Sequence, residues 1–135
     1  AIWGYSAGLA VVQTDAGWGY TDKTGKFEIE PTFDLAHEFS EGLARVCVAR
    51  KWGFIDKTGQ FVIRPKYDIV LDFSEGLAMV QLNKRNAYID KTGKEVLWTR
   101  FEDAWSFRNG LAPVVSGEKS GYIDRNGTVI WEPSK

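Results

Sequence analysis

The chain has 135 residues, a formal net charge of −1, 44% hydrophobic residues and 14% aromatic residues. This size and balance are typical of one globular domain, and the 14 glycines favour β-structure with many turns. The near-zero net charge gives no argument for nucleic acid or an anionic membrane as a partner, and no apolar run approaches the roughly 18 residues that cross a bilayer. We therefore expect neither nucleic-acid binding nor membrane insertion.

A sequence motif recurs four times at a spacing of about 34 residues. Its clearest marker is Gly-Leu-Ala, which begins at Gly8, Gly42, Gly76 and Gly110. The same step divides the chain into repeats 1–34, 35–68, 69–102 and 103–135. The alternation with period two that follows each Gly-Leu-Ala excludes a helical repeat of the same length. We interpret residues 1–135 as a single domain of four β-repeats.

Each repeat contains three runs of aromatic and β-branched residues, which in the second repeat predict strands at 43–48, 52–56 and 60–64. These strands follow one another as an antiparallel meander. A connecting segment, 67–75 in this case, leads to the next repeat, and its aromatic spacing fits either a helical turn or an extended corner. The predicted fold class is all-β, with four tandem three-stranded antiparallel meanders.

The side-chain pattern of the strands predicts which faces are buried. Ala44, Val46 and Val48 share one face of the first strand, and we expect that face to meet the core. Gly53 of the Trp-Gly pair has no Cβ, which predicts close approach of a ring or another backbone. Pro113 cannot donate to a ladder, so its nitrogen should point away from any partner strand.

The tetrapeptide Asp-Lys-Thr-Gly also opens the phosphorylation loop of P-type ATPases, which raises the question of enzyme chemistry. Here it occurs three times, and once as Asp-Arg-Asn-Gly, always at the repeat spacing. A catalytic nucleophile is not normally repeated in this way. Asp at the first turn position accepts backbone N–H groups and Gly at the fourth supplies positive φ, so we interpret the motif as a hairpin turn with a glycine bulge. The turn residues are Asp22, Gly25, Asp56, Gly59, Asp90, Gly93, Asp124 and Gly127.

The order of these elements resembles the bacterial WG repeat, also called the KWG repeat. The resemblance rests on WGFIDKTG at 52–59, VI at 62–63, PKYD at 65–68 and FSEGLA at 73–78, and it extends over essentially the whole chain. It implies a β-rich tandem repeat, often found beside other domains, with no catalytic residues to carry over. The third repeat departs from the pattern, with Asn86-Ala87 for Trp-Gly and Thr99 for Pro, so its local packing is expected to differ while its register is kept.

The first and last repeats are as apolar as the middle ones, whereas the terminal repeats of open arrays usually carry polar caps. Two architectures fit this observation: an open superhelical array, or a small closed propeller-like ring. The chain starts Ala-Ile-Trp without Met, so we expect a processed protein or a piece of a longer one. The compartment stays open, with a secreted or periplasmic bacterial location favoured over the cytoplasm.

Binding residues are sought where the repeats differ, because packing explains the residues that recur. Three tryptophans hold repeat positions and are expected in the core: Trp18, Trp52 and Trp131. Three others replace unrelated residues and are candidates for binding: Trp98, Trp105 and Trp3. An exposed indole offers a flat apolar face and an N–H donor to a protein partner or a sugar ring.

A second set of candidates lies at the variable hairpin tip between the first two strands. Basic residues gather there in the second and third repeats: Arg50, Lys51, Lys84 and Arg85, with Arg45 nearby. This edge could attract an acidic partner, and the alternative is a set of solvated loop tips.

Indications of catalysis are poor. The single histidine, His37, occupies a slot that holds Trp or Leu in the other repeats and is expected to be a half-buried packing residue. Glu28 and Glu30 share a strand face but suit a solvated edge strand better than a catalytic pair. Cys47 lies mid-strand and is expected to be inert; as the only cysteine it forms no internal disulfide. We expect no enzyme activity, no cofactor and no metal.

The sequence therefore predicts a non-catalytic repeat module for protein–protein interaction or scaffolding. A carbohydrate or cell-envelope binder that uses exposed tryptophans is the alternative.

Overall fold

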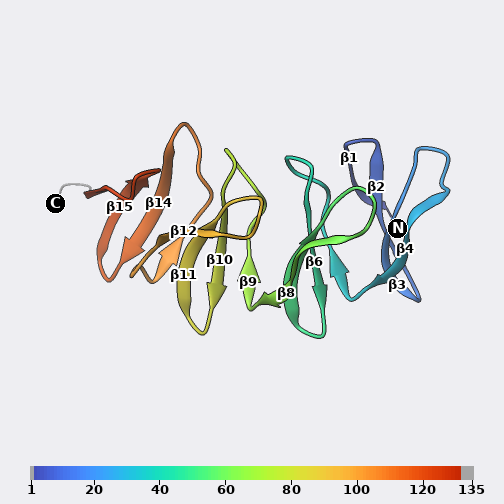
Figure 1. Cartoon of the computed structure of the whole chain (residues 1–135), viewed down its shortest axis with the longest axis horizontal. Coiled ribbons are helices and arrows are strands. Elements are labelled where there is room, and N and C mark those ends of the chain that lie inside the picture. The colour runs from blue at the N-terminus through green and yellow to red at the C-terminus, as the bar shows by residue number, and fades with distance from the viewer. Residues whose placement is uncertain (1, 132–135) are drawn as a thin grey trace. The chain divides into compact units, whose positions relative to one another are not determined.

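The computed structural model describes residues 2–131, with side chains from residue 5 onward. All regular secondary structure in this range is β-strand, and the strands form four antiparallel sheets of four strands each (Figure 1). The predicted all-β architecture of tandem antiparallel meanders is confirmed. The chain forms two compact units, Ala1–Asp68 and Ile69–Lys135, and each unit contains two sheets.

In the first unit, one sheet contains β1 (Ile2–Ser6), β2 (Leu9–Thr14), β3 (Gly17–Thr21) and β4 (Phe27–Phe33), and the other contains β5 (Leu35–Ala36), β6 (Ala44–Val48), β7 (Lys51–Ile55) and β8 (Phe61–Tyr67). In the second unit, one sheet contains β9 (Ile69–Val70), β10 (Ala78–Leu82), β11 (Arg85–Ile89) and β12 (Glu95–Trp98), and the other contains β13 (Asp103–Ala104), β14 (Leu111–Ser116), β15 (Lys119–Asp124) and β16 (Val129–Trp131). Each sheet lies within one sequence repeat.

Each sheet has one strand more than the three predicted. The connecting segment supplies it, because this segment is extended rather than helical: β5 pairs with β6 through Leu35 and Ala36. Leu35 is exposed and Ala36 is buried, which is the alternation of a strand. The N–H of His37 then continues the ladder by donating to the carbonyl of Arg45 at 3.1 Å.

The Asp-Lys-Thr-Gly segments form turns that the aspartate side chain closes. In the second repeat, Asp56 Oδ1 accepts from the Thr58 N–H at 2.9 Å and from the Thr58 hydroxyl at 2.5 Å. Gly59 has φ +90° and donates its N–H to the Asp56 carbonyl at 3.0 Å. The Thr58 hydroxyl lowers the pKa of the Asp56 carboxyl, because the hydrogen bond favours its charged form. These bonds occupy the carboxylate in a structural role.

The glycine of Trp-Gly lies where the third strand comes closest to the second. A Cβ on Gly53 would lie 2.4 Å from the Ile63 carbonyl oxygen and 2.7 Å from the Pro65 nitrogen. At this point the register between β7 and β8 shifts, so that several residues of β8 bulge past Gly53. The predicted close approach is therefore to a backbone, and a side chain is excluded by the bulge.

The third repeat replaces this bulge with hydrogen bonds of the Asn86 side chain and backbone. Ala87 occupies the glycine position and is buried, and β12 stops at Trp98. The Asn86 amide donates to the Phe101 carbonyl at 2.9 Å, and the Thr99 N–H donates to the Asn86 carbonyl at 3.1 Å. The departures from the repeat pattern thus compensate one another, and β10 and β11 keep their register.

Consecutive sheets within a unit pack face to face. We call the side of a sheet that meets the next repeat its outgoing face, and the side that meets the preceding repeat its incoming face. In the first unit the outgoing face contributes Leu9, Val11 and Tyr20, and the incoming face contributes Ala36, Phe39, Ala44, Val46 and Ile55. The rings of Tyr20 and Phe39 meet edge to face with centroids 5.0 Å apart, and the Tyr20 hydroxyl donates to the His37 carbonyl at 2.6 Å.

The second unit repeats this joint at equivalent positions. Its outgoing face contributes Leu77, Met79 and Tyr88, and its incoming face contributes Ala104, Phe107, Ala112, Val114 and Ile123. The Tyr88 and Phe107 centroids are 4.9 Å apart, and the Tyr88 hydroxyl donates to the Trp105 carbonyl at 2.6 Å. One recurring pair of complementary faces therefore holds the sheets of each unit together.

Candidate functional site

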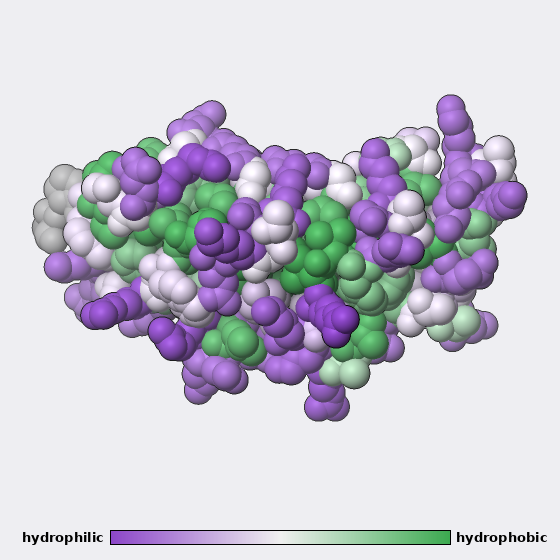
Figure 2. All heavy atoms as spheres, viewed as in Figure 1, coloured by the Kyte–Doolittle hydropathy of each residue, from purple (hydrophilic) through white to green (hydrophobic). Residues whose placement is uncertain are grey.

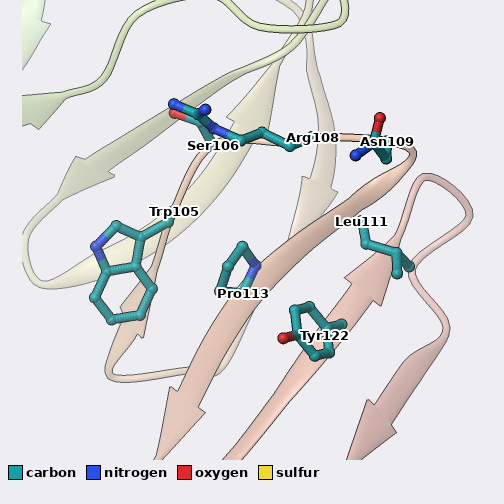
Figure 3. A pocket seen from close by; sticks show the side chains of 7 residues that line it. All are labelled: Trp105, Ser106, Arg108, Asn109, Leu111, Pro113 and Tyr122. Atoms are coloured by element: carbon teal, nitrogen blue, oxygen red, sulfur yellow. The ribbon is translucent and has the colours of Figure 1, made fainter.

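An apolar cleft of about 500 Å³ opens on the fourth repeat (Figure 3). We call it the Trp105 cleft, and its lining consists of Trp105, Ser106, Arg108, Asn109, Leu111, Pro113 and Tyr122. Its volume falls within the range of about 300–1,000 Å³ that is typical of ligand sites. Figure 2 shows hydrophobic surface interspersed with hydrophilic side chains over this repeat.

The aromatic side chains of the cleft are held by the sheet. Pro113 on β14 pairs with Tyr122 on β15, and the N–H of Trp105 donates to the Pro113 carbonyl at 3.1 Å. This hydrogen bond uses the Pro113 carbonyl as acceptor, so the missing N–H of proline does not affect it. The Trp105 carbonyl is held by the buried Tyr88 hydroxyl. In Figure 3 the six-membered part of the indole faces Pro113, while its nitrogen lies on the far side.

The polar side chains of the cleft come from the segment before β14. Arg108 and Asn109 are exposed, and the lining contains no carboxylate. The Arg108 guanidinium has no ion-pair partner among the described residues. The backbone N–H groups of Asn109 and Gly110 are bound by the Glu75 carboxylate, the second at 2.8 Å. The cleft is therefore an apolar surface with one positive charge at its edge.

The cleft coincides with the outgoing face of the fourth repeat. Tyr122 exposes 37% of its surface, whereas Tyr20, Phe54 and Tyr88 at the same repeat position are 0% exposed. Leu111 is half-buried, while its equivalents Leu9, Leu43 and Leu77 are all buried. The fourth repeat thus presents to solvent the positions that the other repeats keep inside the fold.

A smaller cleft of about 190 Å³ also uses Trp105, together with Ile69, Leu71, Met79, Gln81, Asn86, Glu102, Asp103 and Ala104. Most of its polar groups are already engaged. The Asn86 amide binds two carbonyls and accepts from Gln81 at 3.0 Å, and Glu102 Oε1 accepts the N–H of Gly117 at 3.1 Å. Trp105 is the side chain that the two clefts share.

The other sequence candidates lie elsewhere. Trp98 is exposed at the end of β12, where Arg85 stacks on it with its guanidinium carbon 5.0 Å from the ring centroid. Lys51 forms an ion pair with Asp68 of its own repeat. Arg50 and Lys84 are exposed at hairpin tips in different units. The Trp3 side chain lies outside the described residues.

The burial of three tryptophans differs from the prediction. Trp131 was expected in the core but is 39% exposed, because β16 is an edge strand of three residues whose outer side faces solvent. Its ring meets Phe101 edge to face at 5.7 Å. Trp18 and Trp52 are half-buried rather than core residues, since each lies near the tip of its hairpin.

The sequence interpretation missed most of the cleft lining. Leu111 and Tyr122 were absorbed into the repeat pattern, and Arg108 and Asn109 replace the Ser-Glu that precedes Gly-Leu-Ala in the second and third repeats. One indication was available, because Tyr122 shares its repeat position with Tyr20 and Tyr88.

Titratable side chains outside the cleft do not converge. His37 is exposed and its ring lies against Trp52 at 5.6 Å, so the prediction of a half-buried residue was wrong in degree. Glu28 and Glu30 are exposed on the edge strand β4. Burial raises the pKa of the Cys47 thiol, which lowers its reactivity. Within residues 2–131 there is no cluster of ligating side chains for a metal ion and no helix that could span a membrane.

Comparison with known families and structures places the chain in context. The model of the WG-containing repeat matches residues 18–52, 52–85 and 87–119. Among curated protein sequences, none matches the chain.

Among solved structures, Hsv2 with loop 6CD replaced by a Gly-Ser linker has a TM-score of 0.62 at 12% identity, covering 90% of this chain and 46% of that one. Hsv2 from Kluyveromyces lactis has a TM-score of 0.57 at 9% identity, covering 87% and 42%. The extracellular domain of BT4673 from B. thetaiotaomicron has 0.54 at 15%, covering 98% and 23%. The chain spans less than half the length of each of these proteins. They have β-propeller-like repeat folds, and at these identities the similarity concerns the fold only.

Proposed function

Because the chain belongs to the family of WG-containing repeats, we propose that it is a non-catalytic repeat module that binds a protein partner through the Trp105 cleft. The observation that carries this proposal is the exposure of Trp105, Pro113 and Tyr122 beside the half-buried Leu111 in one cleft. Tryptophan and tyrosine are enriched among the residues that dominate binding energy at protein interfaces. Their positions are held by the sheet, so little conformational entropy is lost on binding.

A glycan is the second candidate, because Trp105 also borders the smaller cleft with its carboxylates and carboxamides. The larger cleft fits a sugar less well. Sugar hydroxyls need both donors and acceptors, and the lining of the Trp105 cleft has no carboxylate. In the smaller cleft the Asn86 amide already binds backbone carbonyls. These features favour a protein partner.

Selection from a phage-displayed library of random peptides, with the chain immobilised at low density, tests the proposal. We expect enriched peptides whose affinity falls by at least about tenfold in the Trp105→Ala/Tyr122→Arg variant, since a truncated anchor residue costs roughly 2 kcal/mol. Trp98→Ala is the matched control, because Trp98 is exposed in the same unit but outside the cleft lining. Its affinity should stay at the wild-type value.

Two results would contradict the proposal. One is peptide binding that is equal in the wild type and the double variant. The other is a change in tryptophan fluorescence with sugar at about millimolar concentration that the double variant loses, which would assign the cleft to a glycan.

A further inference from the structure

The incoming face of the first repeat is exposed in the same way as the outgoing face of the fourth. Tyr5 is 52% exposed, whereas Phe39 and Phe107 at the same repeat position are 3% and 0% exposed. Val12 is half-buried, while its equivalents Val46 and Val114 are buried. The two halves of the recurring joint are therefore both present and both uncovered, at opposite ends of the sequence.

We propose that these two faces bind each other between copies of this chain, head to tail, so that the partner in the Trp105 cleft is the first repeat of a second copy. This inference rests on the proposed function and names the partner. Its basis is continuity with an interface that the structure already shows twice. In both joints an outgoing face with a leucine and a tyrosine meets an incoming face of alanine, valine and an aromatic ring. The pairing of Tyr122 with Tyr5 would repeat that of Tyr20 with Phe39.

Two polar contacts of the joint in the second unit have counterparts at the two ends. The Tyr88 hydroxyl donates to the Trp105 carbonyl, and the equivalent bond in the proposed contact runs from Tyr122 to the carbonyl of Trp3 in the second copy. Arg125 donates to the Glu75 carbonyl, and the residue equivalent to Arg125 in the first repeat is Lys23. A cation is therefore available for the same carbonyl, which belongs to Asn109 in the fourth repeat.

Two contacts of the joint in the second unit differ at the ends. The Ser74 hydroxyl donates to the Phe107 carbonyl at 2.6 Å, and its equivalent in the fourth repeat is Arg108. Glu75 binds the N–H groups of Asn109 and Gly110 with a charged carboxylate, whereas its own equivalent in the fourth repeat is Asn109. An amide oxygen accepts a weaker hydrogen bond than a carboxylate. At this position the contact between copies is accordingly weaker than the joint of the second unit, whereas the joint of the first unit has Ala7 there and no carboxylate.

The opposite charges of the first repeat and the Trp105 cleft favour the first repeat of a second copy as the partner. The first repeat carries Asp15, Asp22, Glu28, Glu30 and Asp34 against Lys23 and Lys26. The charged side chain at the cleft is Arg108, which has no ion-pair partner among the described residues. An acidic repeat approaching a cationic cleft associates faster than a neutral one.

Sedimentation velocity of the full chain from about 1 μM to about 1 mM tests the inference. A head-to-tail contact leaves one free face at each end of an open assembly, so the mean mass should rise with concentration, and it should pass the dimer unless the assembly closes into a ring. Tyr122→Arg and Tyr5→Arg should each weaken association by at least about tenfold. Both residues are exposed, so thermal unfolding should confirm that both variants fold. Trp98→Ala should associate like the wild type.

Mixing the two arginine variants gives the decisive result. Each keeps one intact face, and the intact faces are complementary, so the mixture should form a dimer that grows no further. A symmetric contact between two outgoing faces would instead leave Tyr5→Arg associating normally, which would overturn the inference.

Two further results would overturn it. A chain that stays monomeric throughout, while peptide selection still depends on Tyr122, would reject the second copy as partner but leave the proposed function in place. A monomer whose thermal midpoint falls in both arginine variants would show that the two faces close on each other within one chain.

Discussion

Tyr88 and Tyr122 occupy the same position in consecutive repeats, yet one is buried in a joint and the other lines an open cleft. Their local surroundings in the sheet are alike, since each lies on the second strand of a hairpin, opposite a residue of the first strand. What differs is whether a following sheet covers them. The difference teaches that, in a tandem repeat, a recurring residue becomes core or binding surface according to its neighbours and not according to its own repeat.

The largest effect should come from truncating the buried member of this pair. Tyr88→Ala removes a ring that packs on Phe107 and a hydroxyl that holds the Trp105 carbonyl, so we expect a loss of about 3–5 kcal/mol in the free energy of unfolding. Tyr122→Ala, measured by urea denaturation at a concentration where the chain is monomeric, should cost less than about 1 kcal/mol. Equal losses would mean that Tyr122 is covered in solution.

The glycines of the Trp-Gly pairs extend the comparison to the backbone. Gly53→Ala places a methyl group 2.4 Å from the Ile63 oxygen of the seven-residue strand β8, and we expect a loss of about 3 kcal/mol. Gly121→Ala meets the Ile130 oxygen at the same distance, but β16 is a three-residue edge strand that can shift, so the loss should be about 1 kcal/mol. Thermal unfolding of both variants measures the difference, and a larger loss at Gly121 would contradict it.

The hydrogen bonds of Glu75 across the joint should contribute moderately to the free energy of unfolding. Glu75→Gln keeps the shape of the side chain but removes the charge that strengthens two hydrogen bonds to the next turn, so we expect a loss of about 1 kcal/mol. Asn109→Gln, at the equivalent position without a following sheet, should cost only about 0.5 kcal/mol in the monomer, because asparagine tolerates the φ of +53° at this position better than glutamine does. Urea denaturation checks both variants, and a comparable loss in Asn109→Gln would show that the turn itself, and not the joint, is responsible.

The turn aspartates should have the smallest effect on stability, and this effect should not depend on the contact between repeats. Threonine hydroxyls lower the pKa of Asp22, Asp56 and Asp90. A carboxyl whose pKa is lower in the folded state stabilises the fold fully above its unfolded pKa, and this stability is lost as pH falls through the folded pKa. The urea midpoint should therefore be constant from about pH 7 to pH 5 and fall below about pH 4.

Replacing Asp56 by Asn should reduce this acid dependence. A midpoint that falls equally steeply in the variant would assign the acid sensitivity to other groups.

Local features of the fold were predictable because they depend on residues close in sequence. Period-two alternation specifies strands, and the close approach at Gly53 follows from a missing Cβ beside a bulge. The extended form of the connecting segment was not predictable, since β5 is only two residues long and exists by pairing with β6. The exposure of Trp131 was not predictable either, because its strand lies at the edge of the sheet and the repeat pattern does not show strand order.

The amino-acid sequence by itself determined the all-β class, the four repeats and the turns between strands, because short-range backbone preferences and side-chain alternation suffice for these. Only the tertiary structure decided which of the recurring positions form a surface. The sequence marks Tyr20, Tyr88 and Tyr122 as equivalent, and burial separates them because it depends on a neighbouring sheet that no local pattern encodes.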